Sequence, residues 1–158
     1  MTENLTLADV EKGQRLPDLS IDVGVTNVVL GALASRDWRP MHHDKDFAVD
    51  RNGTRHVFVN TPHNAAYFER YITDWTGPLG RMGRIKFRMK DSVFPGDTMV
   101  FFGEVEDVRV DDQGCAWADL RVELRVGDNV TTECTASVAI PRGEDDNPWK
   151  RRGEDWKP

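Results

Sequence analysis

The 158-residue sequence lacks a long apolar segment and an excess of basic residues. No run of 18 apolar residues occurs, so we expect no helix that spans a membrane. Residues 1–5 carry neither the basic nor the apolar region of a signal peptide, and a cytoplasmic protein is therefore expected. The formal net charge of −6 argues against a nucleic-acid partner, which would select a basic patch.

Cysteine is scarce, because Cys115 and Cys134 are the only two and they form no CxxC pair. Cytosolic thiols stay reduced, so we interpret both as small core residues. With 30% charged and 39% hydrophobic residues, the composition is that of a soluble globular protein. A chain of this length is expected to form one domain with a proper core.

A carboxylate and an imidazole stand five residues apart in the segment Asp37-Trp-Arg-Pro-Met-His42-His43-Asp44. On a regular helix these two side chains would diverge by roughly 140°. Pro40 makes such a helix unfavourable, so a turn can direct both groups into one cleft. An ionised carboxylate and an imidazole can together take up and return a proton through one bound water. The segment therefore predicts acid–base chemistry on a small organic substrate at Asp37 and His42.

The clearest helical pattern covers residues 61–75. Thr61 is an available N-cap, and Pro62 follows at the first helical position, where a missing N–H does no harm. Apolar residues recur at helical spacing, and Gly77-Pro78 ends the run. Before this helix, the pattern predicts a strand over 19–25 and a short helix over 28–35.

After Gly80 the hydrophobic period changes to two, which predicts four consecutive strands joined by short turns: 85–90, 99–108, 116–126 and 130–140. Such an antiparallel meander has one buried face, and the 61–75 helix is the only long apolar-striped element that can cover it. We therefore predict an α+β protein with a single hotdog fold, in which a curved antiparallel sheet wraps around a central helix.

The domain is expected to span residues 18–141, after a partly ordered lead-in over 1–17. The charged tail over 142–158 has no period and is expected to be mobile, although Trp149 and Trp156 could hold it against a neighbouring surface.

Residues 37–48 resemble the motif of the MaoC-like (R)-specific enoyl-CoA hydratases, Asp-x-Asn-Pro-Leu-His-x-Asp-Pro-x-aromatic-Ala. Arg39 and Lys45 depart from this motif and Met41 replaces leucine, whereas the remaining positions agree: Asp37, Pro40, His42, Asp44, Phe47 and Ala48. The later Phe94-Pro95-Gly96-Asp97-Thr98 is similar to a turn that the family carries after its central helix. The resemblance covers roughly residues 18–140.

A narrower resemblance is to the small MaoC-like subunits of steroid (cholesterol) side-chain degradation. It rests on four segments: 36–37, 42–44, 58–60 and 70–78. Those subunits hydrate the enoyl-CoA of a shortened sterol side chain and pair with a second MaoC-like subunit that lacks the dyad. This resemblance implies a heteromer. A homodimer and a dimer of dimers stay open, because a single hotdog leaves an exposed sheet edge.

The resemblance implies hydration of a trans-2-enoyl-CoA to a 3-hydroxyacyl-CoA of R configuration, with coenzyme A as part of the substrate and no separate cofactor or metal. The dyad would activate the water. The thioester oxygen is expected near the backbone amides of His63 and Asn64, at the start of the central helix. Arg39, Lys86 and Arg88 are candidates for contact with the CoA phosphates.

The sequence leaves three alternatives to the hydratase function open. A hotdog thioesterase would place its carboxylate on or beside the central helix, where Glu69 and Asp74 lie, although neither is near its start. A non-catalytic acyl-CoA-binding subunit of a heteromeric complex would carry the dyad without using it. A metal hydrolase is the third alternative, because the sequence contains side chains that can bind a divalent ion: Asp37, His42, His43, Asp44, His56 and His63. Phosphohydrolases that use a His-Asp pair have an all-helical scaffold, however, and the high strand content predicted for this chain argues against that scaffold.

Overall fold

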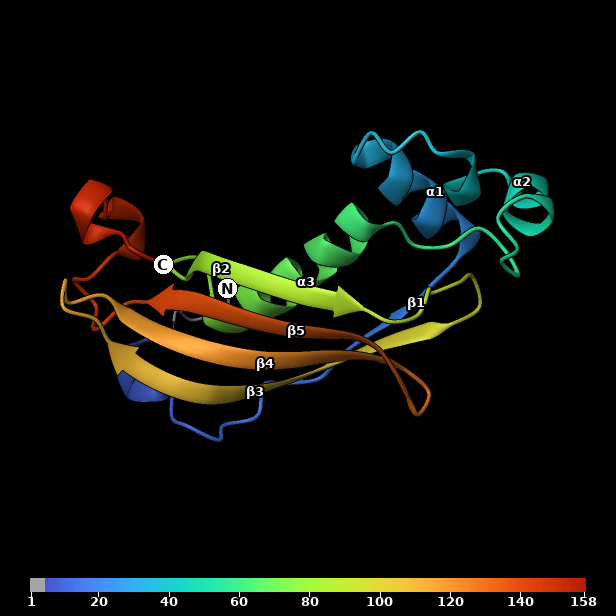
Figure 1. Ribbon diagram of the computed structural model, residues 1–158. Helices are drawn as coiled ribbons and strands as arrows, with labels where there is room; N and C mark the ends of the chain where they lie inside the picture. Colours follow the sequence, from blue (N-terminus) through green and yellow to red (C-terminus); the bar gives the residue numbers. More distant parts are fainter. Residues whose placement is uncertain (1–4) are drawn as a thin grey trace.

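Five antiparallel strands form one curved sheet in the computed structural model, which describes residues 5–158 (Figure 1). Their order across the sheet is β1-β3-β4-β5-β2. The strands are β1 (Leu19–Asp22), β2 (Arg81–Met89), β3 (Thr98–Val110), β4 (Ala116–Val126) and β5 (Asn129–Ile140). The prediction of a four-strand meander was wrong in one strand: β3, β4 and β5 form the meander, whereas β2 pairs with β5 and not with the strand that follows it, β3. The chain therefore crosses from one edge of the sheet to the other side between β2 and β3.

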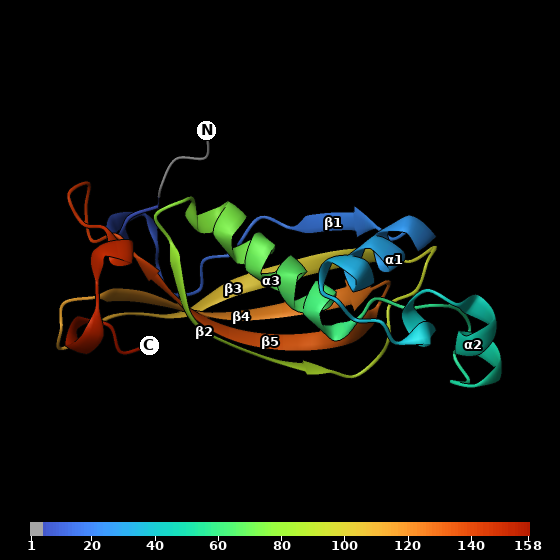
Figure 2. The same cartoon turned by 90° about the horizontal axis from the view of Figure 1, so that it is seen from above.

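The central helix α3 (Thr61–Thr76) lies across the concave face of this sheet, as Figure 2 shows. Its predicted position is confirmed, but its N-cap is Asn60, whose side chain accepts a hydrogen bond from the backbone N–H of His63 at 3.3 Å. Thr61, predicted as the cap, is instead the first helical residue. The helix ends at Thr76 and is followed by the C-cap Gly77, whose φ of 77° favours glycine.

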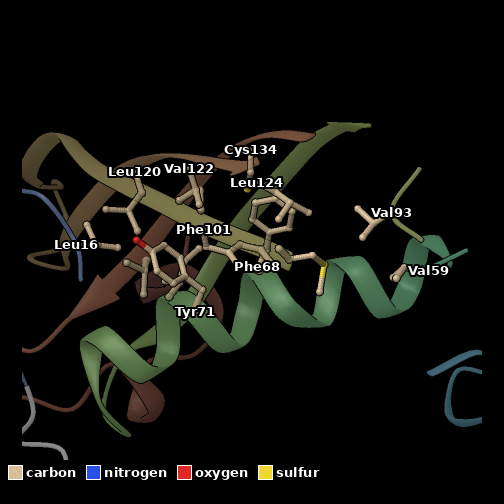
Figure 3. Close-up of a cluster of buried hydrophobic side chains, with 14 of the residues drawn as sticks. Leu16, Val59, Phe68, Tyr71, Val93, Phe101, Leu120, Val122, Leu124 and Cys134 are labelled. Atoms are coloured by element: carbon tan, nitrogen blue, oxygen red, sulfur yellow. The ribbon is translucent and has the colours of Figure 1, made fainter. Parts of the chain in front are cut away.

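The core fills the space between α3 and the sheet (Figure 3). Phe68 of α3 packs edge-on against Phe101 of β3, with ring centroids 5.1 Å apart. Tyr71 lies beside the same ring at 5.7 Å. Cys134 is buried in this core, and Cys115 is buried in a smaller cluster with Trp117. Both thiols are free and occupy the small-residue positions that we predicted.

Two helices lie beyond one end of the sheet, and the segment that contains Asp37 and His42 connects them (Figure 1). Helix α1 (Val25–Ala34) begins three residues earlier than predicted, and β1 correspondingly ends at Asp22. A 3-10 helix over Pro40–His42 follows, and then α2 (Lys45–Asp50), which the hydrophobic pattern did not predict. Asp44 forms the N-cap of α2 by accepting the backbone N–H of Phe47 at 3.0 Å.

The end of the lead-in runs along the outer side of β3. Leu16 N donates to the Gly103 carbonyl at 2.9 Å, and Gly13 N donates to the Val105 carbonyl at 2.8 Å. Val10 and Leu16 are buried in the core, and a 3-10 helix covers Leu7–Asp9. Residues 13–16 therefore extend the sheet at this edge, whereas Leu5 N and Leu7 N donate to the carbonyls of Thr76 and Pro141.

The tail contains two 3-10 helices, Pro148–Lys150 and Gly153–Asp155. Trp156 packs on Trp117 of β4, with ring centroids 5.1 Å apart, and the Arg81 guanidinium lies 3.5 Å from the Trp156 ring centroid. Trp149 Nε1 donates to the Pro78 carbonyl at 3.2 Å. The contacts with a neighbouring surface that we expected of both tryptophans are thus present. Within residues 5–158, no helix is long and apolar enough to cross a membrane.

Candidate active site

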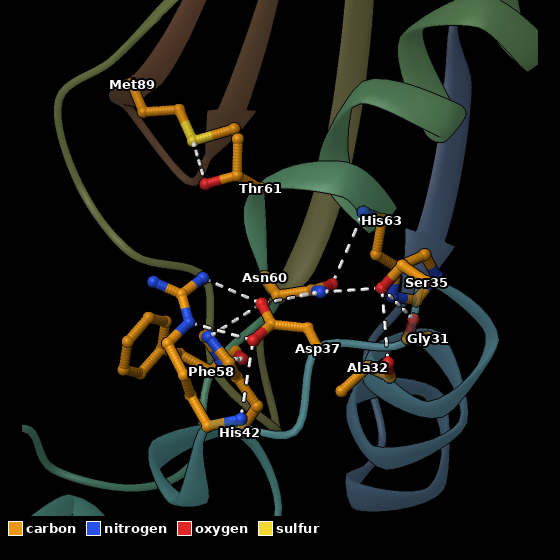
Figure 4. A network of polar contacts seen from close by, with 11 residues as sticks. Gly31, Ala32, Ser35, Asp37, His42, Phe58, Asn60, Thr61, His63 and Met89 are labelled. Carbon is orange, nitrogen blue, oxygen red and sulfur yellow. Dashed lines mark hydrogen bonds and ion pairs between the residues drawn. The ribbon is translucent and has the colours of Figure 1, made fainter.

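Asp37 and His42 lie together at the junction of α1, α2 and the start of α3 (Figure 4). Arg36, with φ 55°, reverses the chain after α1, and Pro40 starts the 3-10 helix that ends at His42. His42 Nε2 is 3.4 Å from Asp37 Oδ2, and the two side chains are 2% and 9% exposed. The spacing of the motif therefore brings the predicted pair into contact, and both members are withdrawn from bulk water.

A backbone carbonyl fixes the orientation of the His42 ring. His42 Nδ1 lies 2.9 Å from the carbonyl oxygen of Phe58, and the ring stands edge-on to the Phe58 ring at 4.7 Å. A carbonyl only accepts hydrogen bonds, so we assign the proton of the neutral imidazole to Nδ1. Nε2 then carries a lone pair directed toward Asp37, and no described residue donates a hydrogen bond to it.

Two acceptors, His42 Nε2 and Asp37 Oδ2, thus face each other across 3.4 Å. One water molecule can satisfy both, because it has two hydrogens to donate. Its own oxygen lone pairs then point away from both groups. This arrangement suits a water molecule that is held and activated by general base catalysis.

Asp37 is held as a carboxylate. Arg39 donates to both of its oxygens, from Nε to Oδ1 at 2.8 Å and from Nη2 to Oδ2 at 2.7 Å, and Asn60 Nδ2 donates to Oδ2 at 3.1 Å. The Arg39 hydrogen bonds, with a smaller contribution from Asn60, hold the pKa of Asp37 well below its usual range, against the opposing effect of burial. Asp37 is consequently a poor proton acceptor at neutral pH.

Asn60 is a site residue that the motif did not identify. Its buried side chain donates to Asp37 and to Ser35 Oγ (2.8 Å), and its Oδ1 caps α3. One amide therefore ties the end of α1, the dyad and the start of the central helix together. Asn60 directly precedes Thr61-Pro62, where an N-cap residue is expected, and this position could have identified it from the sequence.

A hollow of about 260 Å³ opens beside His42. Its lining includes Arg39, Thr61, Asn64 and Lys90, together with apolar side chains such as that of Met89. Within residues 5–158, Asn64 Oδ1 is buried without a hydrogen-bond partner. The hollow therefore combines apolar walls with a few polar groups near the dyad, as is usual for a small-molecule site.

The two backbone amides expected at the thioester oxygen are already engaged. His63 N donates to Asn60 Oδ1 at 3.3 Å, and Asn64 N donates to the Asn60 carbonyl at 3.0 Å. Their role at the thioester oxygen stays a prediction, and their engagement follows from Asn60, and not Thr61, being the helix cap. The backbone N–H of Thr61 has no hydrogen-bond partner among the described residues, and Thr61 lines the hollow.

His63 lies on the other side of α3 from the hollow. Its ring stacks on Tyr67 at 4.5 Å and approaches Gly31 of α1 so closely that an added Cβ there would be 1.8 Å from Nδ1. Burial lowers the pKa of His63. The side chain of His63 therefore contributes to the packing of α1 on α3 and does not line the hollow at His42.

Of the basic residues expected near CoA, only Arg39 lines this hollow. Lys86 and Arg88 are exposed on the outward face of β2, beside a different hollow that Glu133 also lines. The structure does not bring them to the dyad. Glu69 and Asp74, the carboxylates of the thioesterase alternative, are exposed on α3, and Asp74 is 3.2 Å from Arg70.

The histidines and acids of the metal-hydrolase alternative do not converge. Asp44 caps α2, and His56 Nδ1 accepts the backbone N–H of Val57 at 2.9 Å. Over the part of the chain that the structure describes, no group of three or more His, Cys, Asp or Glu side chains is arranged to hold a metal ion.

Comparisons with known proteins identify the family of this chain. The sequence pattern of the family described as MaoC like domain matches residues 9–124. The 3-oxo-4,17-pregnadiene-20-carboxyl-CoA hydratase beta subunit of Mycobacterium tuberculosis is 34% identical over 126 residues, which cover 80% of this chain and 95% of that relative. Similarity therefore extends over almost the whole of that hydratase subunit.

Solved structures show the same architecture. The crystal structure of the ChsH1-ChsH2 complex from Mycobacterium tuberculosis superposes with a TM-score of 0.75 at 32% identity, over 82% of this chain and 98% of that one. The (R)-hydratase from A. caviae involved in PHA biosynthesis gives a TM-score of 0.74 at 25% identity, over 84% and 98%. The predicted hotdog fold is confirmed, and the chain belongs to the MaoC-like domain family.

Proposed function

We propose that this chain hydrates a trans-2-enoyl-CoA to the 3-hydroxyacyl-CoA, and that the acyl group is a steroid side chain. The observation that carries the proposal is the pair of buried acceptors, His42 Nε2 and Asp37 Oδ2, which face each other at 3.4 Å beside a hollow. Membership of the MaoC-like family supports the reaction. The pregnadiene carboxyl-CoA named for the 34% identical relative supports the substrate class.

In this reaction the bound water attacks C3 of the enoyl thioester. His42 Nε2 takes one proton of the water, and Asp37 stabilises the imidazolium that forms. The electron pair of the C2=C3 bond moves toward the thioester carbonyl, and the proton on Nε2 is then returned to C2. The sum is a hydroxyl on C3 and a hydrogen on C2, with no cofactor besides the CoA of the substrate. We expect the R configuration that the family motif implies.

Negative charge develops on the thioester oxygen during the attack, and a hydrogen-bond donor must face it. We assign this role to the backbone N–H of Thr61, because Thr61 is the first residue of α3, at the positive end of the helix dipole, and is one of the residues that line the hollow. Removing one donor of this kind typically costs about 3–4 kcal/mol in the activation free energy. Arg39 and Lys90, at the same hollow, are candidates for contact with the CoA phosphates.

A second MaoC-like chain is part of the proposal. The hollow of about 260 Å³ is small for a steroid and part of CoA, since sites that enclose drug-sized ligands measure about 300–1,000 Å³. Core aromatic side chains, Phe68 and Phe101 among them, fill the space under α3. A partner would have to supply the remaining volume, and one structural relative is named as a two-chain complex.

The test is a hydration assay on the purified chain, alone and co-expressed with its genomic neighbours, with crotonyl-CoA and with a steroid enoyl-CoA. We expect loss of the enoyl absorbance without release of free thiol, and no loss with the Asp37→Asn variant. Thiol release would instead support the thioesterase alternative. Absence of turnover with either thioester, with and without a partner, would contradict the proposed hydration and leave a non-catalytic subunit.

A further inference from the structure

The turn over residues 94–97 lies against the loop that orients His42. Gly96, with φ 94°, bends the chain, and the Asp97 side chain closes the turn by accepting the backbone N–H of Phe94 at 2.8 Å. Gly96 N donates to the Val23 carbonyl at 2.8 Å, and Val23 N donates to the Asp97 carbonyl at 2.9 Å. The turn is therefore held both by its own side chain and by the residue that follows β1.

One peptide unit connects this turn to His42. The Phe58 carbonyl oxygen lies 2.9 Å from His42 Nδ1 (Figure 4), and the N–H of the same peptide unit, on Val59, donates to the Val93 carbonyl at 2.9 Å. A trans peptide unit is planar, with its C=O and N–H directed to opposite sides, so a hydrogen bond to one of them also orients the other. Val93 is buried and directly precedes Phe94. The position of the turn therefore determines where the Phe58 carbonyl points.

A row of side chains makes a second connection between the turn and His42. The Phe58 ring stands edge-on to the His42 ring at 4.7 Å and to the Phe94 ring at 6.1 Å. The Arg55 guanidinium lies over the Phe94 ring, 4.4 Å from its centroid, and Arg55 Nη2 is 2.5 Å from Asp97 Oδ1. Edge-on aromatic pairs and cation–π contacts are both favourable arrangements. Asp97 takes part in both connections, because one of its oxygens closes the turn and the other binds Arg55.

The position of the proton on His42 depends on the Phe58 carbonyl. A neutral imidazole carries one N–H, and an acceptor that faces Nδ1 selects the tautomer in which Nε2 has the lone pair. Without that acceptor the proton can move to Nε2, where Asp37 Oδ2, at 3.4 Å, is available as its partner. In that tautomer Nε2 cannot take a proton from a bound water molecule.

We propose that Asp97 is a positioning residue for the dyad: through the turn over 94–97 and the 58–59 peptide unit, it keeps the proton of His42 on Nδ1. Its expected effect on turnover rests on the proposed function, in which Nε2 of His42 is the base. The tautomer of His42 is observable without any turnover, so the two proposals can fail separately.

Long-range proton–nitrogen NMR spectra of the full chain with isotope-labelled histidine show which ring nitrogen carries the proton. They are recorded at about pH 8, where histidine is ordinarily neutral, and His42→Ala assigns the signals of that ring. We expect the proton on Nδ1 in the wild type and a shift toward Nε2 in Asp97→Ala, in which the N–H of Phe94 loses its acceptor. Asp97→Asn keeps an oxygen acceptor and should restore the Nδ1 tautomer.

The same variants are compared in the hydration assay. We expect kcat of Asp97→Ala to fall at least about tenfold with a smaller change in KM, because displacement of a catalytic group by about 1 Å can cost about 100-fold in rate. Asp97→Asn should recover most of this loss. A wild type without turnover but with the expected tautomers would contradict the proposed hydration and support the positioning role of Asp97.

Asp22→Ala is the matched control. Asp22 Oδ1 accepts the hydroxyl of Thr98 at 2.7 Å, so this variant removes a carboxylate hydrogen bond beside the same turn but none that leads to Phe58. It should keep the tautomer of the wild type. If circular dichroism shows that Asp97→Ala does not fold, Phe94→Leu replaces it, because leucine removes the edge-on ring and keeps an apolar side chain; the same proton shift is expected.

Three results would overturn the proposal. The first is a His42 proton on Nε2 in the wild type. The second is a proton that stays on Nδ1 in folded Asp97→Ala, or in Phe94→Leu where that variant replaces it. The third is a proton shift in Asp22→Ala as large as that in Asp97→Ala.

Discussion

The guanidinium of Arg39 donates to both carboxylate oxygens of Asp37, at 2.8 and 2.7 Å. The family motif has asparagine at this position, which could offer one neutral donor but no positive charge. Because Arg39 keeps Asp37 ionised, His42 is left as the group that can accept a proton from the bound water. In the proposed hydration, the two members of the dyad therefore have different tasks: Asp37 orients and stabilises, and His42 transfers the proton.

Substitution of either dyad member should abolish most of the hydration. For Asp37→Asn and His42→Ala we expect kcat to fall by roughly 10²–10⁴-fold, because general acid–base catalysis contributes about this much. Steady-state kinetics with an enoyl-CoA, after a circular dichroism check of folding, provide the measurement. His43→Ala is the matched control, since His43 is the exposed neighbouring imidazole. An effect of His43→Ala as large as that of His42→Ala would contradict our assignment of the base.

Loss of Arg39 should raise the pKa of Asp37 and lower stability. The pKa of Asp37 in the folded protein lies below its unfolded value of about 3.9, so its ion pair stabilises the protein above about pH 4 and is lost as the pH falls. For Arg39→Gln we expect a loss of about 1 kcal/mol at pH 7, a reduced value because Arg39 is 60% exposed.

Urea unfolding of the wild type and Arg39→Gln at several pH values gives these free energies, and carboxyl NMR reports the titration of Asp37. The difference in the free energy of unfolding between the two proteins should become smaller as the pH is lowered toward 3. Arg39→Asn, the residue of the family motif, should retain activity. An unchanged Asp37 titration in Arg39→Gln would refute the role of the guanidinium.

Two functions of Asn60 can be separated by substitution. Serine can still cap α3 but cannot reach Asp37 and Ser35 in the same way, whereas alanine loses both contacts. We expect Asn60→Ala to be less stable than Asn60→Ser by about 1 kcal/mol. Both should reduce kcat, because Asp37 loses a donor. Thermal or urea unfolding combined with kinetics tests this, and full activity in Asn60→Ser would argue against positioning of Asp37 by the amide.

His63 should make the folded protein sensitive to mild acid. Its folded pKa is lowered by burial, so the unfolded chain binds more protons between the folded pKa and the unfolded value of about 6.5. Stability should therefore decrease as the pH falls below about 6.5. His63→Phe keeps an aromatic ring against Tyr67 and should reduce this dependence in urea unfolding. If the free energy of unfolding of His63→Phe changes with pH as steeply as that of the wild type, the acid sensitivity does not come from His63.

The close approach of Gly31 to His63 predicts a non-additive pair of substitutions. An added Cβ at Gly31 would lie 1.8 Å from His63 Nδ1, so Gly31→Ala should cost about 1–3 kcal/mol through overpacking of α1 on α3. In a His63→Ala background the obstructing ring is gone, and the added methyl should cost much less. A double-mutant cycle measures this coupling, and additive free energies would show that the helices separate freely.

Much of the fold follows from local patterns in the sequence. The alternation of apolar and polar residues after Gly80 predicts which face of each strand is buried, and the apolar stripe over 61–75 does the same for the helix. Both patterns can be recognised from residues that are close together in the sequence. Helix α2 escaped prediction because its six residues are too few for a helical period to emerge. The N-cap was placed one residue late, since Asn60 and Thr61 are both good caps.

By itself, the sequence determined the curved sheet around one helix and the identity of the Asp37 and His42 pair, because periodicity and motif spacing are properties of adjacent residues. Only the tertiary structure decided that the Phe58 carbonyl orients His42, that Asn60 reaches Asp37, and that the amides of His63 and Asn64 are occupied. It also decided that β2 is the uncovered edge while the lead-in covers the other. These contacts join segments distant in sequence, and their geometry is set by how α1, α3 and the sheet pack together.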